Sequence, residues 1–441
     1  MNLSDIARVL NVPCTLDYVL SGISIDSRKV KAGNLFVALR GEHFDGHDYI
    51  ADAARSGAVV VICEQLHAEA GIEQLVVNSS LEALAAIATW YRQEFTCPII
   101  AVTGSNGKTS VKEMIAHILP QPSLATAGNL NNHIGVPLSI FQLQPEHRYA
   151  VFELGASHIG EIAYTVAMIQ PQVALINNIA PAHIEGFGSI EGVAQAKGEI
   201  YQGLSTGGIA VVNDDDAYAH FWDETITSHP VIRFSQLHAA DVWASDVVLN
   251  ASGCAEFTLN LPDESALVRL KVPGLHSVSN ALAAAACTHA IGISLSDIQN
   301  GLTSFSGVSG RMMFFKGKNQ ATIIDDTYNA NLRSTLAAVQ VLANCPGVRI
   351  LVLGDMAELG AWSEQHHEAV GIAAREQRID GLLTCGKLGV KSALAFGSGG
   401  KHYVNQHELT QDLLRRLDSD TTVLVKGSRS AAMENIVQEL I

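Results

Sequence analysis

The sequence contains no long apolar run. No stretch of about 18 uninterrupted apolar residues occurs, so a membrane-spanning helix is not expected. The opening "MNLSDIARVLNVP" also lacks the apolar core of a signal peptide. Basic residues are few, because 28 Lys and Arg stand against 44 Asp and Glu and leave a net charge of −16. Nonspecific nucleic-acid binding needs clustered Lys and Arg, so we expect no nucleic-acid partner, whereas a local basic pocket for a phosphorylated substrate remains open.

Paired cysteines are absent as well. The seven cysteines are scattered along the chain, their number is odd, and no Cys-x-x-Cys pair occurs. This spacing argues against a disulfide framework and favours a reducing compartment, so we expect a cytoplasmic protein. Internal repeats and low-complexity tracts are also missing. The 441 residues are 48% hydrophobic and 16% charged, which predicts a compact globular protein.

A glycine-rich turn stands within residues 97–114, "CPIIAVTGSNGKTSVKEM". The apolar residues before Gly104 predict a buried strand, and the residues from Lys108 onward have helical spacing. A helix N-terminus offers free N–H groups to phosphate, Lys108 would neutralise phosphate oxygens, and the Thr109 hydroxyl would reach Mg²⁺. The standard pattern has its first glycine where this chain has Val102, so the alternative of an ordinary strand-to-helix turn stays open. We interpret the stretch as an ATP site.

Three domains of the α/β class are predicted. Short strands and helices come first, and a helix over 81–95 then leads into the glycine-rich turn. Buried strands alternate with helices from there, as in a parallel sheet, until residues 240–275 indicate antiparallel additions. A second alternating pattern after Arg311 is typical of a Rossmann-like domain. The predicted domains are residues 1–80, 81–310 and 311–441.

Two side chains of the central region are candidate metal ligands from the residue pattern, and a nearby lysine is not. Glu153 stands near the end of a buried strand, where its carboxylate would either reach Mg²⁺ or pair with a surface lysine. His183 follows another strand end, as a ligand or as a hydrogen-bonded structural residue. Lys197 lies in a predicted helix, where the residue pattern alone indicates a solvated charge.

Polar loops follow three strands of the C-terminal region. "DDTYNAN" (325–331) and "VKGSRS" (425–430) would either bind a ligand or serve turn chemistry, since Asp, Asn, Gly and Ser favour turns. "GDMAELGAWSEQHHEAV" predicts a strand, a turn that includes Asp355, and a helix capped by Ser363.

Together, nine ordered stretches resemble the Mur ligases. They are "VTGSNGKTSVKEM", "TAGNLNNHIGVP", "ELGASHIGEI", "NNIAPAHIEGFGS", "AKGEI", "GLHSVSNALAAAA", "DDTYNAN", "GDMAELG" and "VKGSRSAAMENIV". "GNLNN", "YNAN" and "GDMAELG" are similar to the members that add D-alanyl-D-alanine rather than to those that add earlier residues. The family often has Asn, Asn and Pro where this chain has Ser157, Ser277 and Leu332.

The resemblance implies an ATP-dependent amide ligase of peptidoglycan precursor synthesis. The terminal carboxylate of UDP-N-acetylmuramoyl-tripeptide would form an acyl phosphate with ATP. The amine of D-alanyl-D-alanine would then displace phosphate and leave an amide bond. We expect a monomer, with a UDP-sugar domain at residues 1–80 and a C-terminal domain that binds the dipeptide.

The resemblance also implies roles for individual residues. ATP would contact Gly104, Ser105, Asn106, Gly107, Lys108, Thr109, Ser110, Asn280 (adenine), Arg311 (γ-phosphate), Asp326 (ribose) and Asn329. Two Mg²⁺ ions would be held by Thr109, Glu153, His183 and Lys197. The UDP-sugar peptide and the dipeptide would contact Ser27, Glu42, His43, Phe44, Asn129, Asn131, Asn132, Lys426, Ser428 and Arg429. Lys197 would be carbamylated by CO₂, which requires a neutral amine of the kind that burial favours.

Three other classes remain as alternatives. A small-molecule kinase or NTPase would use the same phosphate site and stop at phosphate transfer, although the sequence lacks the NKxD motif. A ligase of the folylpolyglutamate synthase type would lack the first domain. An ATP-gated scaffold would bind nucleotide without turnover. Release of ADP only when both acceptor and amine are present distinguishes the ligase.

Overall fold

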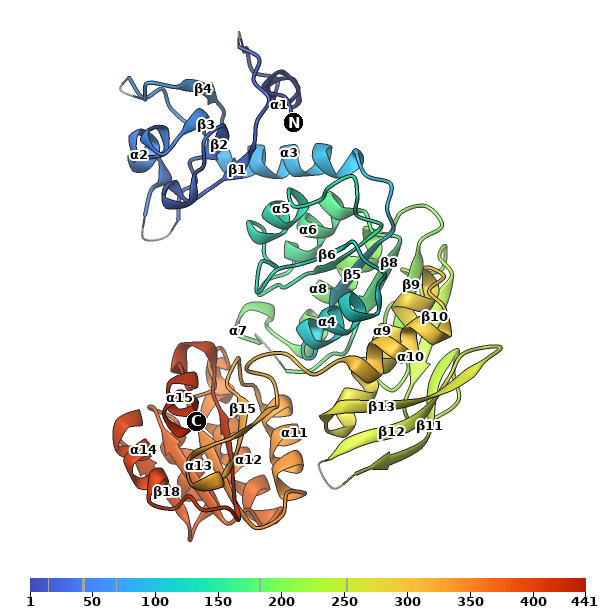
Figure 1. Ribbon diagram of the computed structural model, residues 1–441, viewed down its shortest axis with the longest axis vertical. Helices are drawn as coiled ribbons and strands as arrows, with labels where there is room; N and C mark the ends of the chain where they lie inside the picture. Colours follow the sequence, from blue (N-terminus) through green and yellow to red (C-terminus); the bar gives the residue numbers. More distant parts are fainter. Residues whose placement is uncertain (15, 42–43, 69, 182–183, 251–252) are drawn as a thin grey trace.

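Three β-sheets follow one another along the chain, from the blue N-terminal part to the red C-terminal part (Figure 1). The computed structural model describes residues 1–14, 16–41, 44–68, 70–181, 184–250 and 253–441. Each sheet has helices packed against it, so the predicted α/β class is confirmed. The residue boundaries of the three domains stay a prediction.

The first sheet has four parallel strands in the order β1-β2-β3-β4. Alternate side chains of β2 are buried on opposite faces: Leu35 and Val37 pack toward α1, and Phe36 packs toward α2. This alternation is the two-residue period of a strand buried on both sides. The elements are α1 (Leu3–Leu10), β1 (Gly22–Ser24), η1 (Ser27–Lys29), β2 (Asn34–Val37), η2 (Gly46–Tyr49), α2 (Ile50–Arg55), β3 (Ala58–Cys63) and β4 (Glu73–Val76).

Helix α3 (Ser80–Gln93) belongs to two apolar cores at once. Leu84 and Ile87 are buried in the core of the first sheet, whereas Ala88 is buried in the core of the second. Two partly buried residues of the central region, Ile134 and Phe141, also pack on the first core. The helix therefore joins the first two sheets through continuous packing.

The central sheet has nine strands in the order β13-β12-β11-β10-β9-β8-β5-β7-β6. Its strands from β6 to β11 are parallel, so the carboxyl ends of β5, β7 and β8 lie at one edge, where α/β sheets bind ligands. The elements are β5 (Ile99–Thr103), α4 (Lys108–Ile118), β6 (Ser123–Ala125), α5 (Gly135–Ile140), β7 (Tyr149–Glu153), α6 (Glu161–Ile169), β8 (Val173–Ile176), α7 (Ile184–Phe187), α8 (Ile190–Gln202), β9 (Ile209–Asn213), β10 (Val231–Ser235), β11 (Val242–Leu249), β12 (Cys254–Asn260), β13 (Ser265–Pro273), α9 (Leu275–Ala290) and α10 (Leu295–Ser304).

The antiparallel additions predicted for residues 240–275 are confirmed. Strand β11 pairs with β12, and β12 pairs with β13, both antiparallel. Helix α9, rich in alanine, packs closely on this side of the sheet beside α4. Its small side chains allow the backbone of the helix to approach the sheet.

The third sheet has the order β14-β15-β19-β16-β17-β18, in which only β14 is antiparallel to its neighbour. Apolar cores lie on both faces, as in a Rossmann-like fold. The elements are β14 (Met313–Lys316), η3 (Lys318–Gln320), β15 (Thr322–Asp326), α11 (Leu332–Ala343), β16 (Val348–Leu353), η4 (Gly360–Trp362), α12 (Ser363–Glu376), β17 (Gly381–Cys385), α13 (Gly389–Phe396), β18 (Gly400–Tyr403), α14 (Gln406–Leu414), β19 (Thr421–Lys426), η5 (Arg429–Ala431) and α15 (Glu434–Leu440).

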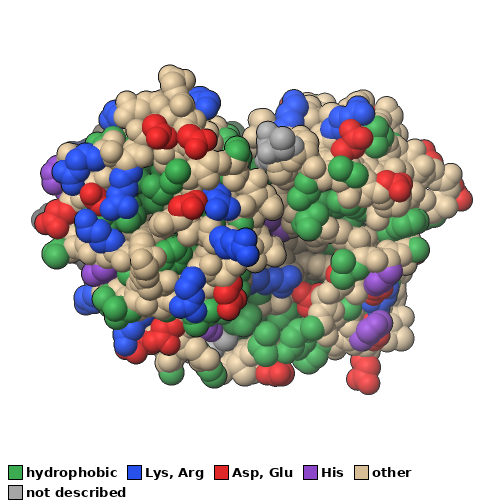
Figure 2. Space-filling model, turned by 90° about the horizontal axis from the view of Figure 1, so that it is seen from below, with side chains coloured by type: hydrophobic (Ala, Val, Ile, Leu, Met, Phe, Trp, Pro, Cys, Tyr) green, Lys and Arg blue, Asp and Glu red, His purple; other side chains and the backbone are tan. Residues whose placement is uncertain are grey.

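Seen from below, a hollow separates two lobes of the molecule, with Lys and Arg side chains at its edge (Figure 2). The left lobe is the C-terminal sheet with its helices, and the right lobe contains β11 to β13 (Figures 1 and 2). None of the helices in the described part of the chain combines the length and hydrophobicity that a membrane span needs.

Candidate active site

The glycine-rich turn, residues 104–107, connects the carboxyl end of β5 to the first residue of α4. Gly107 has φ +79°, and a Cβ there would lie 2.5 Å from both Asn177 Nδ2 and Asn280 Oδ1. Only glycine tolerates this positive φ together with so close an approach. The turn thus directs the free N–H groups of the α4 N-terminus into the space that it encloses, as phosphate binding requires.

Gly107→Ala should therefore prevent nucleotide binding. A β-carbon would meet the Asn177 and Asn280 amides, and the left-handed backbone alone costs a non-glycine residue about 1–3 kcal/mol. We expect ADP affinity, measured by isothermal titration calorimetry, to fall at least about tenfold. Gly207→Ala is the matched control, since Gly207 also has a positive φ (+75°) but has no neighbour within 4 Å. Equal ADP affinity in the two variants would contradict the close-approach explanation.

Two asparagines after β8 hold the turn in place. Asn177 Nδ2 donates to Asn106 O and to Asn280 Oδ1, each at 2.9 Å. Asn178 Nδ2 donates to Asn106 O at 3.0 Å, and its Oδ1 accepts the Asn106 N–H at 3.0 Å. The Ser105 N–H donates to Asn178 O at 2.9 Å. The sequence analysis did not assign Asn177 or Asn178, although two carboxamides directly after a buried strand were the available signal.

Arg311 brings a C-terminal cation to the turn. Its Nη2 donates to Thr109 Oγ1 at 2.8 Å, and its guanidinium lies 4.2 Å from the centroid of the Tyr328 ring. Its Nε is buried without a hydrogen-bond partner among the described residues. The aromatic face and the threonine together fix the guanidinium beside the start of α4.

Lys108 is the first residue of α4, and its Nζ donates to Gly104 O at 2.6 Å. Burial lowers the pKa of Lys108, the Glu153 carboxylate raises it, and the Arg311 guanidinium lowers it. Lys108, Arg311 and Glu153, which come from different elements, therefore lie close enough for their charges to interact. Ser110 follows in the first turn of α4 and is partly buried.

Glu153 ends β7 with only 2% of its surface exposed. Its Oε1 accepts a hydrogen bond from Asn131 Nδ2 at 2.7 Å, and its N–H donates to Thr126 Oγ1 at 3.0 Å. Its Oε2 is buried without a hydrogen-bond partner, and the described residues give it no lysine partner. A half-satisfied buried carboxylate fits a divalent cation, because the desolvated charge needs compensation.

Lys197 lies on α8 and is 1% exposed, so the interpretation as a solvated charge is wrong. It forms no hydrogen bond or ion pair with the described residues, and its Nζ lies 5.8 Å from the centroid of the Phe187 ring. Burial, and next the charge of Lys108, holds the pKa of Lys197 well below 10.5. The predicted ligand His183 lies outside the described residues. Within them, no group of three or more His, Cys, Asp or Glu could hold a metal ion.

The residues assigned to the nucleoside and the dipeptide lie close together. Lys426 Nζ and Asp326 Oδ2 form a buried ion pair at 2.5 Å, and Lys426 Nζ also donates to Asn329 O at 3.0 Å. Asp326, assigned to ribose, and Lys426, assigned to the dipeptide, are thus one charged pair. Asn280 is buried, and its Nδ2 has no hydrogen bond within the described residues.

The other predicted dipeptide residues differ in their surroundings. Ser428 is buried, and its Oγ lies 3.2 Å from Ser430 Oγ. Arg429 is exposed at the surface and forms an ion pair with Glu434 at 2.8 Å. These positions alone do not bring Lys426, Ser428 and Arg429 onto one ligand.

Two of the polar loops contain a carboxylate that accepts backbone N–H groups. Asp325 Oδ1 accepts the N–H two residues later at 3.1 Å, which is local turn chemistry. Asp355 instead accepts three N–H groups of residues 387–389, from a distant part of the chain at the start of α13. The predicted cap of α12 was wrong, because Ser363 is the first helical residue. Its hydroxyl donates backwards to Gly360 O at 2.7 Å and does not accept a helix N–H.

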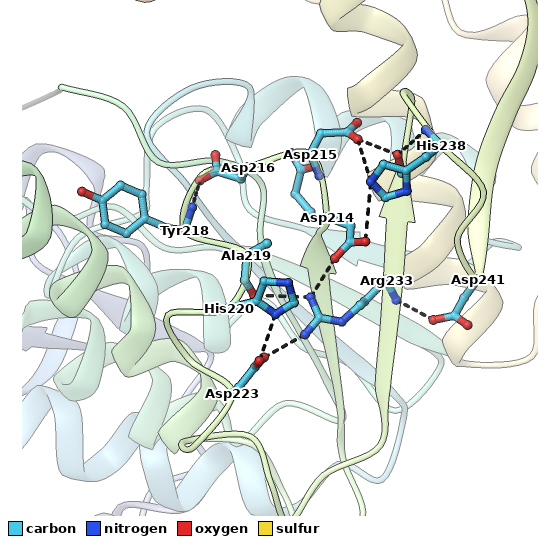
Figure 3. Close-up of polar contacts among 12 residues, drawn as sticks. Asp214, Asp215, Asp216, Tyr218, Ala219, His220, Asp223, Arg233, His238 and Asp241 are labelled. Carbon is cyan, nitrogen blue, oxygen red and sulfur yellow. Dashed lines mark hydrogen bonds and ion pairs between the residues drawn. The ribbon is translucent and has the colours of Figure 1, made fainter.

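An acidic cluster follows β9 (Figure 3). Arg233 lies between Asp214 and Asp223, and its Nη1 and Nη2 each donate to one of them at 2.8 Å. Asp216 Oδ2 accepts the N–H of Ile179 at 2.9 Å. Since protein groups satisfy these carboxylates, the cluster anchors the segment after β8 that carries Asn177 and Asn178.

The predicted uridine side lies on the first domain. Ser27 opens η1, whose cap Asp26 accepts from Arg28 and has its pKa lowered to about 2 by that side chain. Phe44 is 59% exposed. Glu42 and His43 lie outside the described residues.

The "GNLNN" loop contributes differently at each asparagine. Asn129 is exposed, and Asn131 binds the Glu153 carboxylate. Asn132 Oδ1 accepts the N–H of Gly135 at 2.8 Å and so serves the start of α5. Of the three, Asn131 is the one that the structure brings to the candidate metal ligand.

Unpartnered polar atoms concentrate around the glycine-rich turn. Among the described residues, eight buried side-chain nitrogen or oxygen atoms have no hydrogen-bond partner. Four of the eight surround the turn: Asn106 Nδ2, Asn177 Oδ1, Glu153 Oε2 and Arg311 Nε. Each costs about 1–3 kcal/mol if left unpaired, so their gathering in one place indicates a polar ligand.

Family models match all three parts of the chain. The model described as Mur ligase family, catalytic domain, matches residues 19–92. The Mur ligase middle domain matches residues 102–288, and the Mur ligase, glutamate ligase domain, matches residues 310–429.

Relatives of known name match the whole chain. The UDP-N-acetylmuramoyl-tripeptide–D-alanyl-D-alanine ligase of Escherichia coli strain K12 is 46% identical, over 100% of this chain and 98% of the relative. A crystal structure of MurF from Acinetobacter baumannii, 37% identical, superposes with a TM-score of 0.93 over 99% of this chain and 98% of that one. The MurF ligase of Thermotoga maritima in complex with ADP, 28% identical, gives 0.84 over 95% and 96%. The chain therefore belongs to the Mur ligase family.

Proposed function

We propose that this chain joins UDP-N-acetylmuramoyl-tripeptide to D-alanyl-D-alanine by an amide bond, at the expense of ATP. The relatives carry this activity in their names, and the identity of 46% extends over the full chain. The observation that carries the proposal is the group of four unpartnered buried atoms that the central and C-terminal sheets direct at the glycine-rich turn. Two donors and two acceptors there suit a phosphate chain with bound cations.

ATP would lie between the central and C-terminal sheets. The turn from Gly104 to Thr109 would hold its phosphates, and Asn280 Nδ2, which has no hydrogen bond with the described residues, would meet the adenine. Asp326 and Asn329, both bound to Lys426 on the C-terminal side, would meet the ribose. The relative that was solved with ADP supports a nucleotide site in this fold.

The buried, half-satisfied carboxylate of Glu153 supports one Mg²⁺ ion, and the resemblance implies a second. Thr109 and Glu153 would hold one, and His183 with a carbamate on Lys197 would hold the other. Mg²⁺, when bound, neutralises phosphate charge and polarises the γ-phosphoryl group. The Lys197 amine is buried and has no polar partner among the described residues, which supports the carbamate, because only a neutral amine adds CO₂.

The first step brings two anions together. A carboxylate oxygen of the tripeptide attacks the γ-phosphorus of ATP, a new P–O bond forms, and the bond to the β,γ-bridging oxygen breaks to release ADP. Lys108 and Arg311, which both contact residues between Gly104 and Thr109, offset the repulsion. Preorganised charge of this kind is usually the largest catalytic contribution.

The second step forms the amide. The dipeptide amine attacks the acyl carbon, the C–O bond to phosphate breaks, and the nitrogen gives up a proton as inorganic phosphate leaves. The acyl phosphate must be kept from water until the amine arrives. Docking of the C-terminal sheet against the turn, through Arg311 and Thr109, supports this exclusion of water.

The long acceptor would extend over the first two domains. Its uridine end would meet Ser27 and the loop that contains Phe44, and the "GNLNN" loop would meet the peptide. Lys426, Ser428 and Arg429 remain the proposed dipeptide contacts, with Lys426 acting through its pair with Asp326. An Acinetobacter baumannii relative, 37% identical, is described as a ligase for the 2,6-diaminopimelate-containing acceptor, so we propose diaminopimelate as the third residue.

One measurement tests the proposed function. ADP release is followed with Mg-ATP and UDP-N-acetylmuramoyl-tripeptide, with and without D-alanyl-D-alanine, and the product is identified by mass spectrometry. We expect release that depends on the dipeptide and a UDP-muramoyl-pentapeptide in the spectrum. Release that ignores the dipeptide would favour a kinase or NTPase.

Arg311→Ala should lower kcat by about 100-fold or more while changing the KM for the UDP-sugar peptide little. The guanidinium touches the turn, not the predicted uridine side. Arg333→Ala is the matched control, because Arg333 Nη1 also bonds across the two sheets, to Ile179 O at 3.0 Å, but contacts no residue of the turn. A pure KM effect in Arg311→Ala would remove Arg311 from the phosphate-transfer site.

A further inference from the structure

We propose that Asn331 is a positioning residue that couples docking of the C-terminal domain to the orientation of the Asn106 side chain in the phosphate turn. The inference rests on the proposed function, since it concerns how that site is assembled. Asn331 lies 225 residues from Asn106 in sequence, yet its Nδ2 donates to Asn106 Oδ1 at 2.7 Å. This bond joins the first turn of a C-terminal helix to the phosphate turn of the central domain.

The Asn331 side chain is fixed before it reaches across. It is the N-cap of α11, and its Oδ1 accepts the N–H of Ser334 at 2.9 Å. The Ser334 hydroxyl in turn accepts the Asn331 N–H at 3.1 Å, which completes a capping box. Because Oδ1 must face the helix N–H, the amide group can present only its Nδ2 donor to the central domain.

The Asn331 Nδ2 donor fixes the orientation of the Asn106 side-chain amide. The Asn106 backbone is already held on both sides, its N–H by Asn178 and its carbonyl by Asn177 and Asn178. A donor from Asn331 requires an acceptor, so Asn106 offers Oδ1. A carboxamide is planar, and therefore its Nδ2 points the opposite way, where it is buried without a partner. Asn331 thus orients Asn106 Nδ2, which is one of the four unpartnered atoms of the site.

This bond links the orientation of the Asn106 amide to docking of the C-terminal domain. With the C-terminal sheet displaced, Asn106 loses the donor that selects one orientation of its amide. With the sheet docked, Nδ2 is held as a donor toward the phosphates, next to the cations Lys108 and Arg311. Phosphate binding and docking thereby favour each other, as any two events linked through one shared group must.

The experiment compares Asn331→Ser with Ser334→Ala. Serine caps a helix about as well as asparagine, but its hydroxyl is too short to reach Asn106, so Asn331→Ser removes the bridge and keeps the cap. Ser334→Ala removes half of the capping box and leaves the bridge. Both proteins are assayed for dipeptide-dependent ADP release, for thermal stability, and for hydrogen exchange of the peptide covering residues 104–110.

We expect Asn331→Ser to lower kcat/KM for ATP by up to about tenfold, as for loss of one hydrogen bond, and to speed exchange in residues 104–110 at a near-native melting temperature. Ser334→Ala should behave as wild type in both readouts. In an Asn106→Ala background, Asn331→Ser should cause no further loss.

Wild-type rates and exchange in Asn331→Ser would overturn the inference, as would an equal effect of Ser334→Ala. Hydrogen exchange is measured without turnover. It therefore tests the role of the Asn331–Asn106 hydrogen bond even if the chain proves not to be a ligase. Failure of dipeptide-dependent ADP release in the wild-type protein would instead count against the proposed function.

Discussion

Lys108→Ala should reduce ADP release by about 10²–10³ or more while the fold remains intact. Lys108 is the first residue of α4, and its Nζ sits over the carbonyl of Gly104 inside the phosphate turn. No neighbouring cation can replace it, because Arg311 is already engaged with Thr109 and Tyr328. Removing the Lys108 charge removes one of the two cations that offset the repulsion between the carboxylate and the phosphate.

The control for this variant is an exposed lysine in an ordinary ion pair. Lys391 bonds to Glu364 at the surface, and Lys391→Ala should leave turnover unchanged. Circular dichroism and thermal melting would verify that Lys108→Ala is folded. A folded Lys108→Ala protein with near-normal activity would remove the phosphate-binding interpretation of the turn.

Lys197→Ala should lose almost all activity and regain part of it with short carboxylic acids. Lys197 is buried, lacks a polar partner among the described residues, and has a lowered pKa because of burial and Lys108. Its amine is therefore neutral at a lower pH than the amine of an exposed lysine, and only the neutral amine adds CO₂. A small carboxylate that enters the space left by the side chain would supply the missing anion.

The carbamate can be observed directly. With ¹³C-labelled bicarbonate, a carbamate carbon signal should persist well below pH 10.5 and disappear as the pH falls through the lowered pKa of Lys197, because protonation of the amine releases CO₂. Activity should fall over the same range. A signal that behaves as for an exposed lysine would contradict the assignment.

Lys112 supplies the matched control for this signal. It is equally buried, but its Nζ donates to Thr126 O at 2.8 Å and pairs with Glu113. Its amine is thus occupied by two acceptors of the protein. Lys112→Met should keep the carbamate signal that Lys197→Ala loses, and loss of the signal in both variants would mean that it does not report on Lys197.

Local patterns predicted much of the fold. The strand and helix around the glycine-rich turn were predicted because a continuous apolar run, glycine and helical spacing all lie within a few residues of each other. The antiparallel strands β11 to β13 were predicted for the same reason. Ser363 shows the limit of such reasoning, since the start of a helix depends on which residue first adopts helical angles, and Ser363 is itself that first helical residue and not the cap.

The candidate site was only partly predictable, because much of it is assembled over long range. Asn331 reaches Asn106 across 225 residues, and Asn178 reaches it across 72. Neither pairing leaves a periodic signal in the sequence. Lys197 is the opposite case, because its local pattern indicated solvent, and only packing of α8 against the sheet buries it.

The double membership of α3 bears on the entropy of closing the enzyme. Three domains connected by two flexible linkers would lose orientational freedom at both linkers when the substrates are enclosed. Here Leu84 and Ala88 of one helix lie in the cores of two different domains, so packing already holds the first two domains together. Only the linker before Arg311 is left to be immobilised, and correspondingly less of the binding energy is consumed in ordering the protein.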